Sequence, residues 1–356
     1  MDKAMSNKEE EILYEKLRSK ISGSITDAEL KKKTKIANEI IELKREKNAV
    51  ILVHNYMEPI LFSSIPDFVG DSLELSRRAA STEKDIIVFC GVKFMAETAK
   101  ILNPDKTVLL PSLEAGCSLA ASICADDVRL LKQRYPGVPV VTYVNTYADV
   151  KAESDICCTS GNATAVVESL HTDTVIFIPD EYMAKNIAHQ TGKHVIVPRL
   201  NDEKRESTEI DYADLTKGMI VWNGKCEVHE KFTKADIDKA RREYPGVAIL
   251  AHPECSPEVI EAVDFSGGTT TMVKYVEQSN APYFLLLTEC SMAENIAAMY
   301  PEKSILRINS IRCPHMDRIS LEKTLWSLRN ECYQIEVPEE IQKRASLAIT
   351  KMLAIG

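Results

Sequence analysis

The residues with the clearest capacity for chemistry lie in the stretch Gly224-Lys-Cys-Glu-Val-His-Glu230. It brings a cysteine, an imidazole and carboxylates together directly after the apolar run 219–222. Thiolate, imidazole and carboxylate groups all ligate metal ions, so the stretch is either part of a metal site or an ordinary strand-to-helix turn. Cys226 alone does not decide between these interpretations.

An internal repeat helps to decide. Three segments each combine an apolar run, a polar turn, Met-Ala and a helical pattern, and their methionines are Met95, Met183 and Met292. The offset between the last two is 109 residues, and Tyr-Pro-Gly-Val recurs with the same offset at 135 and 244. The offset between the first two is 88, so the second copy is predicted to contain an insertion after its methionine, for which the polar stretch 201–218 is the candidate.

Three cysteines are equivalent in this repeat. Cys117 and Cys313 follow their methionines by 22 and 21 residues, and Cys226 does the same once the insertion is removed. Equivalent loops of three pseudo-symmetric copies meet at one axis, so the three thiolates are predicted to converge. Such a set suits a zinc ion with an open position or a [4Fe–4S] cluster with one iron free, and soft ligands favour the cluster. An open iron is a Lewis acid and favours loss of water over electron transfer.

Polar residues gather at equivalent predicted strand ends. The three triplets are His54-Asn55-Tyr56, Tyr143-Val144-Asn145 and His252-Pro253-Glu254. Ligands bind at the carboxyl ends of strands in open α/β sheets, so the triplets are candidate substrate residues. One polar group at a strand end is often only a satisfied hydrogen-bonding group, but three matching triplets favour a binding site.

Each copy also has a polar segment some 15 to 18 residues after its triplet, at the start of a predicted helix. The three segments are Gly70-Asp-Ser72, Thr159-Ser-Gly-Asn162 and Gly267-Gly-Thr-Thr270. Helix N-termini with hydroxyl groups bind carboxylate or phosphate. Simple helix capping explains the same residues, and the two interpretations are compatible.

The elements that position these residues alternate between apolar runs and helical patterns, which predicts an α/β fold with parallel sheets. Several runs are apolar throughout, as in strands covered on both faces. The predicted strands are 49–54, 85–90, 106–110, 138–144, 174–179, 194–198, 219–222, 247–251, 283–288 and 304–308.

Composition excludes several classes of protein. The net charge is −9 over 356 residues, which argues against nucleic acid as a partner. No apolar run has the ~20 residues needed to cross a membrane, and the N-terminus lacks a signal-peptide pattern, so a cytoplasmic enzyme without a membrane partner is expected. The ten cysteines then indicate metal ligation, redox chemistry or burial rather than disulfides.

The chain resembles the quinolinate synthase family over about residues 45–330. The resemblance rests on nine phrases in order: His-Asn-Tyr (54–56), Gly-Asp-Ser-Leu-Glu (70–74), Gly-Val-Lys-Phe-Met-Ala-Glu-Thr-Ala-Lys (91–100), Ala-Gly-Cys-Ser-Leu-Ala (115–120), Tyr-Val-Asn (143–145), Thr-Ser-Gly-Asn-Ala (159–163), Cys-Glu-Val-His (226–229), His-Pro-Glu-Cys (252–255) and Cys-Pro-His-Met (313–316).

The resemblance implies three pseudo-symmetric three-layer αβα domains around a central [4Fe–4S] cluster held by Cys117, Cys226 and Cys313. The domains expected are 47–134 (completed by C-terminal helices in 318–356), 135–243 and 244–317, after an N-terminal helical segment, 1–46. The implied reaction condenses iminoaspartate with dihydroxyacetone phosphate to quinolinate, with loss of phosphate and two waters, in NAD biosynthesis. Functional coupling to an oxidase or dehydrogenase that produces iminoaspartate is also expected.

The resemblance also implies roles for single residues. Tyr56 and Glu254 match the family's acid/base groups, helped by His54 or His252. The expected substrate contacts are His54, Ser72, Tyr143, Val144, Asn145, Ser160, His229, His252, Pro253, Glu254 and Thr269, although His229 is as well suited to orient the cysteine loop. The family usually has Ser-Thr where this chain has Gly268-Thr269, so one hydroxyl group is missing.

Two other functions compete. A cluster-dependent hydro-lyase acting on a hydroxy acid would explain the cysteines and the anion sites, but it explains the triplets less well. A redox or metal sensor would need a partner-binding segment, and no basic stripe is visible. The adjacent Cys157-Cys158 pair is predicted to be buried rather than redox-active, because vicinal disulfides are strained.

Overall fold

The computed structural model describes residues 2–21, 25–198 and 216–355, with side chains from residue 8 onward. Most of the predicted insertion 201–218 therefore lies outside the described residues. No helix in the described part of the chain is both long and apolar enough to cross a membrane. The chain divides into two compact units, one of Met1–Gly116, Gly246–Ala248 and Val273–Glu336, the other of Cys117–Pro245, Ile249–Met272 and Val337–Gly356.

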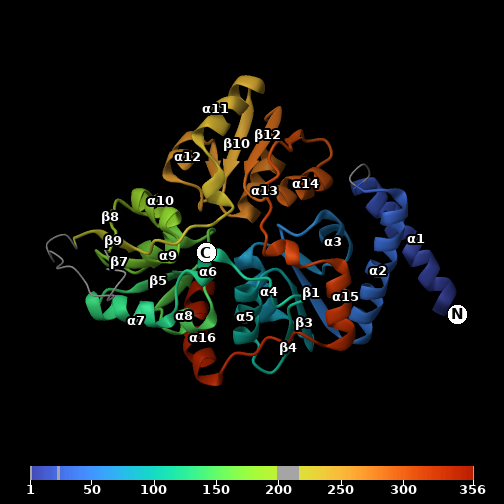
Figure 1. Cartoon of the computed structure of the whole chain (residues 1–356), viewed down its shortest axis with the longest axis horizontal. Coiled ribbons are helices and arrows are strands. Elements are labelled where there is room, and N and C mark those ends of the chain that lie inside the picture. Colours follow the sequence, from blue (N-terminus) through green and yellow to red (C-terminus); the bar gives the residue numbers. More distant parts are fainter. Residues whose placement is uncertain (1, 22–24, 199–215, 356) are drawn as a thin grey trace. The chain divides into compact units, whose positions relative to one another are not determined.

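The first sheet belongs to the first compact unit and is parallel, with strand order β2-β1-β3-β4. Its strands are β1 (Ala49–His54), β2 (Phe68–Gly70), β3 (Ile86–Cys90) and β4 (Thr107–Leu109). The helices around it are α1 (Asp2–Ile21), α2 (Asp27–Glu46), α3 (Pro59–Ser64), α4 (Ser72–Ser81), α5 (Lys93–Leu102) and α15 (Leu321–Asn330). Helices α2 and α15 pack side by side, although they are far apart in the sequence (Figure 1).

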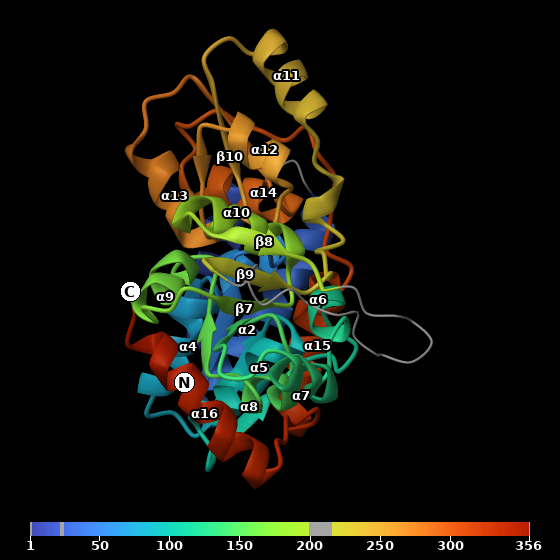
Figure 2. The ribbon, with the colours of Figure 1, turned by 90° about the vertical axis from the view of Figure 1, so that its left-hand side faces the viewer.

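The second sheet belongs to the second compact unit and is also parallel, with order β6-β5-β7-β9-β8. Its strands are β5 (Val140–Tyr143), β6 (Ile156–Cys158), β7 (Val175–Ile178), β8 (His194–Ile196) and β9 (Gly218–Val221). Its helices are α6 (Ser118–Ala121), α7 (Ala125–Arg134), α8 (Ala148–Ala152), α9 (Ala163–Ser169), α10 (Glu181–Thr191) and α16 (Glu339–Leu353). Figure 2 shows α16, the last helix, running beside α8, against which it packs.

The third sheet has the order β11-β10-β12-β13, and its edge strands pair in parallel with their neighbours. Its strands are β10 (Val247–Ala251), β11 (Phe265–Ser266), β12 (Tyr283–Leu287) and β13 (Ile305–Leu306). The remaining helices are α11 (Lys234–Glu243), α12 (Pro257–Ala262), α13 (Thr269–Gln278), α14 (Cys290–Met299) and the 3₁₀ turns η2 (His229–Lys231) and η3 (Met316–Arg318).

The predicted α/β fold with parallel sheets and flanking helices is confirmed. Strands β1, β3, β5, β7, β9 and β10 are buried along their whole length, because helices cover the sheets on both faces. All ten predicted strands are present. The three-domain division stays a prediction; α15 packs on α2 of the first sheet's layer, whereas α16 packs on α8 and β6.

Three strands were not predicted, and they are the same element of each copy. Strands β2, β6 and β11 contain only two or three residues, too few to show a periodic pattern. Each begins next to an aspartate that ties it to the neighbouring strand. The Oδ2 atoms of Asp67, Asp155 and Asp264 accept the backbone N–H groups of Ile51, Val140 and Ile249, each at 2.8 Å. The aspartates recur with the offsets 88 and 109 of the methionines, so the structure confirms the repeat.

One strand equivalence in the second copy was wrong. Each Met-Ala helix pattern is followed by another apolar run, at 107–111, 194–198 and 304–308, and their common place in the repeat predicts that these three strands are equivalent. In the structure, β9 pairs with β7 as β4 pairs with β3, and β8 lies outside β9. The additional residues of the second copy therefore include β8, a strand added at the sheet edge.

Candidate active site

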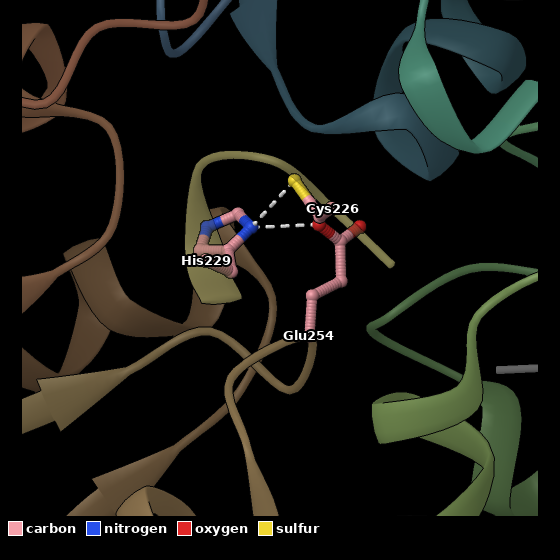
Figure 3. Close-up of side chains that lie close together, drawn as sticks. All are labelled: Cys226, His229 and Glu254. Carbon is pink, nitrogen blue, oxygen red and sulfur yellow. Dashed lines mark hydrogen bonds and ion pairs between the residues drawn. The ribbon is translucent and has the colours of Figure 1, made fainter. Parts of the chain in front are cut away.

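Glu254 bonds to three polar side chains of the second compact unit, and Figure 3 shows its carboxylate facing one of them, His229. Its side chain is buried, and its Oε1 atom accepts hydrogen bonds from the Tyr143 hydroxyl at 2.6 Å and from Asn145 Nδ2 at 3.2 Å. Its Oε2 atom lies 2.7 Å from His229 Nδ1. The structure thus brings together residues of two predicted triplets and the histidine that follows Cys226.

Electrostatics keep Glu254 ionised. Burial opposes the charge, but the His252 and His229 imidazoles and the hydrogen bonds from His229 and Tyr143 outweigh it and hold the pKa of Glu254 well below its usual range. The two imidazole rings stack with centroids 4.5 Å apart. The carboxylate is therefore an acceptor in a buried site, where electrostatic interactions are strong.

Two atoms beside this network have no hydrogen-bond partner in the described structure. Asn145 Oδ1 and Asp180 Oδ2 are both buried, and unpaired buried polar atoms are rare in folded proteins. Asp180 lies near Glu254, and burial followed by the charge of Glu254 raises the pKa of Asp180 well above its usual value. Unpaired atoms around an ionised carboxylate are typical of a site that completes its hydrogen bonds with a ligand.

The three cysteine loops have the same local structure. In each copy, a residue at the start of the Met-Ala helix donates its N–H to the carbonyl two residues before the cysteine: Lys93 to Ala115 (2.7 Å), Glu181 to Gly224 (2.8 Å) and Cys290 to Ile311 (3.0 Å). Each cysteine carbonyl then accepts the N–H four residues later: Ala121 to Cys117 (3.0 Å), Glu230 to Cys226 (3.0 Å) and Asp317 to Cys313 (3.1 Å). The predicted equivalence of the cysteines is therefore present in the backbone.

Cys226 lies next to groups that ligate metals. Its Sγ atom is 3.2 Å from His229 Nδ1, and the donor atoms of Cys226, His229 and Glu254 all lie within 4.8 Å of one another (Figure 3). Burial and the charges of Glu254 and Cys117 raise the pKa of the Cys226 thiol well above its usual value. Two thiols and a carboxylate gathered in this way could hold a metal, because a cation would neutralise them. From the sequence, His229 was expected to contact the substrate or to orient the cysteine loop, and not to be a metal ligand itself.

Tyr56 and His54 lie in the first compact unit. The Tyr56 hydroxyl is 2.5 Å from Thr288 Oγ1, and the Tyr56 N–H donates to His54 Nδ1 at 3.2 Å. The corresponding bond joins the Glu254 N–H to His252 Nδ1 at 3.4 Å. Thr288 was not predicted, because it is the last residue of the predicted strand 283–288 and belongs to none of the polar segments that the repeat singled out.

The helix-starting residues are placed as predicted. Ser72 opens α4, where Asp71 Oδ1 accepts the N–H groups of Leu73 and Glu74. Thr269 opens α13 and is buried. Ser160 and Gly268 line a cavity of about 240 Å³ next to Pro253. A Cβ atom at Gly268 would lie 3.0 Å from Ser160 Oγ, so glycine permits a close approach that the family's usual serine would crowd.

The remaining predicted residues are part of the frame. Val144 is buried, and its N–H donates to the Cys158 carbonyl at 2.8 Å. Cys157 and Cys158 are fully buried, as predicted, and burial raises the pKa of Cys157 to about 12. Thiols of this kind are poor nucleophiles, which agrees with a structural role.

Parallel sheets whose strand ends carry a buried carboxylate, imidazoles, unpaired polar atoms and thiols define the chain as an α/β enzyme for small molecules. Comparison with known proteins agrees. The family model described as quinolinate synthetase A protein matches residues 38–354. The chain belongs to this family.

Curated relatives support the assignment. Quinolinate synthase 2 of Mesorhizobium japonicum is 54% identical over 316 residues, which cover 89% of this chain and 90% of the relative. Quinolinate synthase of Sinorhizobium fredii is 51% identical and covers 88% and 80%. Quinolinate synthase of Caulobacter vibrioides is 48% identical and covers 94% and 85%.

Proposed function

We propose that the protein condenses iminoaspartate with dihydroxyacetone phosphate to quinolinate, with loss of phosphate and two waters, as a step of NAD biosynthesis in the cytoplasm. The observation that carries the proposal is the hydrogen bonding of the Glu254 carboxylate. Its bonds to Tyr143 and Asn145 join the Tyr143-Val144-Asn145 triplet to the His252-Pro253-Glu254 triplet, and it also bonds to His229. The triplet residues are those that match the family's substrate contacts.

The proposed cofactor is a [4Fe–4S] cluster held by Cys117, Cys226 and Cys313. The donor chemistry fits, because thiolates are the usual cluster ligands and the charges around Cys226 call for a cation. Cys313 belongs to the other compact unit, and its assignment rests on the repeat and on its loop hydrogen bonds. When bound, the cluster supplies a Lewis-acidic iron with an open position.

The chain's own residues bind the substrates and move protons. Ser72, Ser160 and Thr269 are proposed to bind carboxylate or phosphate groups at helix starts. Glu254 is the proposed proton acceptor because it matches the family's acid/base group, and Tyr143 and Asn145 hold its Oε1 atom in place. The Tyr56 hydroxyl is the second acid/base group, and groups of this kind each contribute about 10²–10⁴-fold to the rate.

The first test concerns the cluster. Cys226→Ala should abolish the iron–sulfur absorbance of anaerobically purified protein and lower its iron and sulfide content. Cys158→Ala is the matched control, because Cys158 is buried outside the three loops and should leave both unchanged. The reverse pattern would overturn the assignment. Zinc without sulfide would instead indicate a mononuclear site at Cys226, His229 and Glu254.

The second test concerns the reaction. Cluster-replete protein is assayed anaerobically with dihydroxyacetone phosphate and iminoaspartate, which an oxidase or dehydrogenase produces in the same vessel because iminoaspartate is unstable. We expect quinolinate. Its absence, together with dehydration of a simple hydroxy acid, would favour the competing hydro-lyase.

A further inference from the structure

The phrase Met-Ala-x-Asn-Ile-Ala occurs twice in the repeat, at 183–188 and 292–297, and the proposed reaction does not use it. Its methionines, its isoleucines and the alanine after each methionine are buried on helices α10 and α14. Its asparagines are also buried, since Asn186 is 6% exposed and Asn295 1% exposed. A buried amide needs hydrogen-bond partners, so the contacts of these two side chains indicate their purpose.

Both asparagines bond to backbone carbonyl groups of a polar triplet. Asn186 Nδ2 donates to Pro253 O at 2.9 Å and to Cys255 O at 3.0 Å. Asn295 Nδ2 donates to Asn55 O at 3.0 Å and to Met57 O at 2.9 Å. In each case the two carbonyl groups lie on either side of one residue, which is Glu254 in the first case and Tyr56 in the second.

The two turns held in this way are alike. Met57 donates its N–H to His54 O at 3.0 Å, and Cys255 donates its N–H to His252 O at 2.9 Å. Helix α14 packs on α3, which follows the Tyr56 turn, and α10 packs on α12, which follows the Glu254 turn (Figure 1). Helix α10 of the second copy therefore holds a turn of the third copy, and helix α14 of the third copy holds a turn of the first copy.

The first copy has no asparagine at this place in its Met-Ala helix. The residue of the first copy equivalent to the asparagines is Thr98, whose hydroxyl donates within its own helix to Phe94 O at 2.8 Å. The triplet with apolar Val144 at its centre is instead held by Thr146, which bonds to Tyr143 O at 3.2 Å, and by the buried Lys151, which bonds to Thr146 O. In the described part of the chain, both asparagine contacts of this kind are made to turns with an ionisable residue in the middle.

In Asn295, the hydrogen bonds to the Tyr56 turn come from the two N–H groups of the side-chain amide and not from its oxygen. Its Oδ1 atom is buried without a hydrogen-bond partner in the described structure. The unpaired oxygen costs stability, whereas both N–H groups of the amide are bonded, so the donors are the part of the side chain that this position uses. The two N–H groups on one nitrogen fit the two carbonyl groups, which neither a hydroxyl nor a carboxylate could satisfy together.

We propose that Asn186 and Asn295 are matched positioning residues, which fix Glu254 and Tyr56 by hydrogen-bonding the carbonyl groups on both sides of each. The assignment of Glu254 and Tyr56 as acid/base groups rests on the proposed function. The backbone contacts themselves do not, so the two claims are tested separately.

The test of the contacts is hydrogen exchange on the full chain as purified, without substrate. Asn186→Asp replaces the two donors with an acceptor of the same size, and it should speed amide exchange in 252–257 by roughly tenfold while leaving 54–58 unchanged. Asn295→Asp should show the opposite pattern. Each variant thus serves as the control for the other. Unchanged exchange in both turns of the folded variants would overturn the proposal.

The test of positioning uses the cluster-replete enzyme. Each Asp variant should lower kcat by about 10–100-fold with KM changed by less than about threefold, because small displacements of a catalytic group reduce rate more than binding. Thr98→Val, at the equivalent place in the first copy, should stay within about twofold of the parent protein. Equal losses in all three variants would show a general structural role and overturn the proposal.

Misfolding of the variants and failure of the proposed reaction can each be distinguished from failure of the positioning proposal. If the Asp variants fail to fold, Asn186→Ala and Asn295→Ala remove the donors without adding charge, and the same exchange pattern is expected from them. If exchange changes as predicted but no protein makes quinolinate, the contacts stand and the proposed reaction fails.

Discussion

The turns at His54–Met57 and His252–Cys255 have the same backbone and different side-chain environments. Both bond the central N–H to a histidine Nδ1 atom, and both are held by an asparagine. In the first, Tyr56 is partly exposed and its hydroxyl bonds to Thr288. In the second, Glu254 is 3% exposed and bonds to Tyr143, Asn145 and His229.

The difference shows how one repeated frame supports two kinds of acid/base group. A carboxylate buried in a low-dielectric site must be surrounded by donors and positive charge to stay ionised. A phenol is neutral at pH 7 and needs no such shell. The Glu254 turn is therefore the centre of a network, whereas the Tyr56 turn presents a single hydroxyl group.

The largest expected effect is on the catalytic rate, where removal of Glu254 should cost more than removal of the Tyr56 hydroxyl. Glu254→Gln should lower kcat of the cluster-replete enzyme by roughly 10³-fold or more, because the proton acceptor is lost and the donors around it lose their charged partner. Tyr56→Phe should lower kcat by roughly 10²-fold. Steady-state kinetics measure both, with iron content as the control for cluster loss. Equal losses would mean that the two turns contribute alike.

The free energy of unfolding should also depend more on the contacts of Glu254 than on those of Tyr56, although the expected changes are smaller than those in kcat. Tyr143→Phe removes a charge-assisted hydrogen bond to Glu254, and we expect it to lower the free energy of unfolding by about 2 kcal/mol. Tyr56→Phe removes a bond between neutral groups and should cost about 1 kcal/mol or less. Urea unfolding of the protein without its cluster compares the two; a larger loss for Tyr56→Phe would contradict the comparison.

The smallest expected effect concerns Glu58. Glu58 follows the His54–Met57 turn, and Ser256 has the same place after the His252–Cys255 turn. Burial raises the pKa of Glu58, which Lys33 only partly offsets, and its Oε1 atom has no partner in the described structure. Because the folded pKa lies above the unfolded value of about 4.3, the stability due to the protonated group is complete below that pH. It is lost as the pH rises through the folded pKa.

Glu58→Gln removes this titration. The variant should be about 1 kcal/mol more stable than the parent at pH 8, and the gain should shrink toward pH 4. Unfolding measured at several pH values tests this, with Ser256→Ala as the matched variant whose effect should not depend on pH. A gain that grows at low pH would have the wrong sign.

Much of the fold could be predicted because parallel strands covered on both faces leave long apolar runs in the sequence. Strands 49–54 and 247–251 were predicted with the bounds that the structure has. Strands β2, β6 and β11 were missed because two or three residues carry no period. The sequence assigned 194–198 to the wrong place in the sheet of the second copy. An apolar run predicts a strand but not the strand beside it, because the order of strands in a sheet depends on hydrogen bonds between residues far apart in the sequence.

The sequence by itself determined the repeat, the family and the equivalence of Cys117, Cys226 and Cys313, because these follow from spacing and residue type. Only the tertiary structure decided which polar residues bond to one another. The contacts of Glu254 with Tyr143 and His229, and those of Asn186 with Pro253, join residues many positions apart. Spacing along the chain carries no information on such contacts, because they form only when helices and strand ends of different copies pack together.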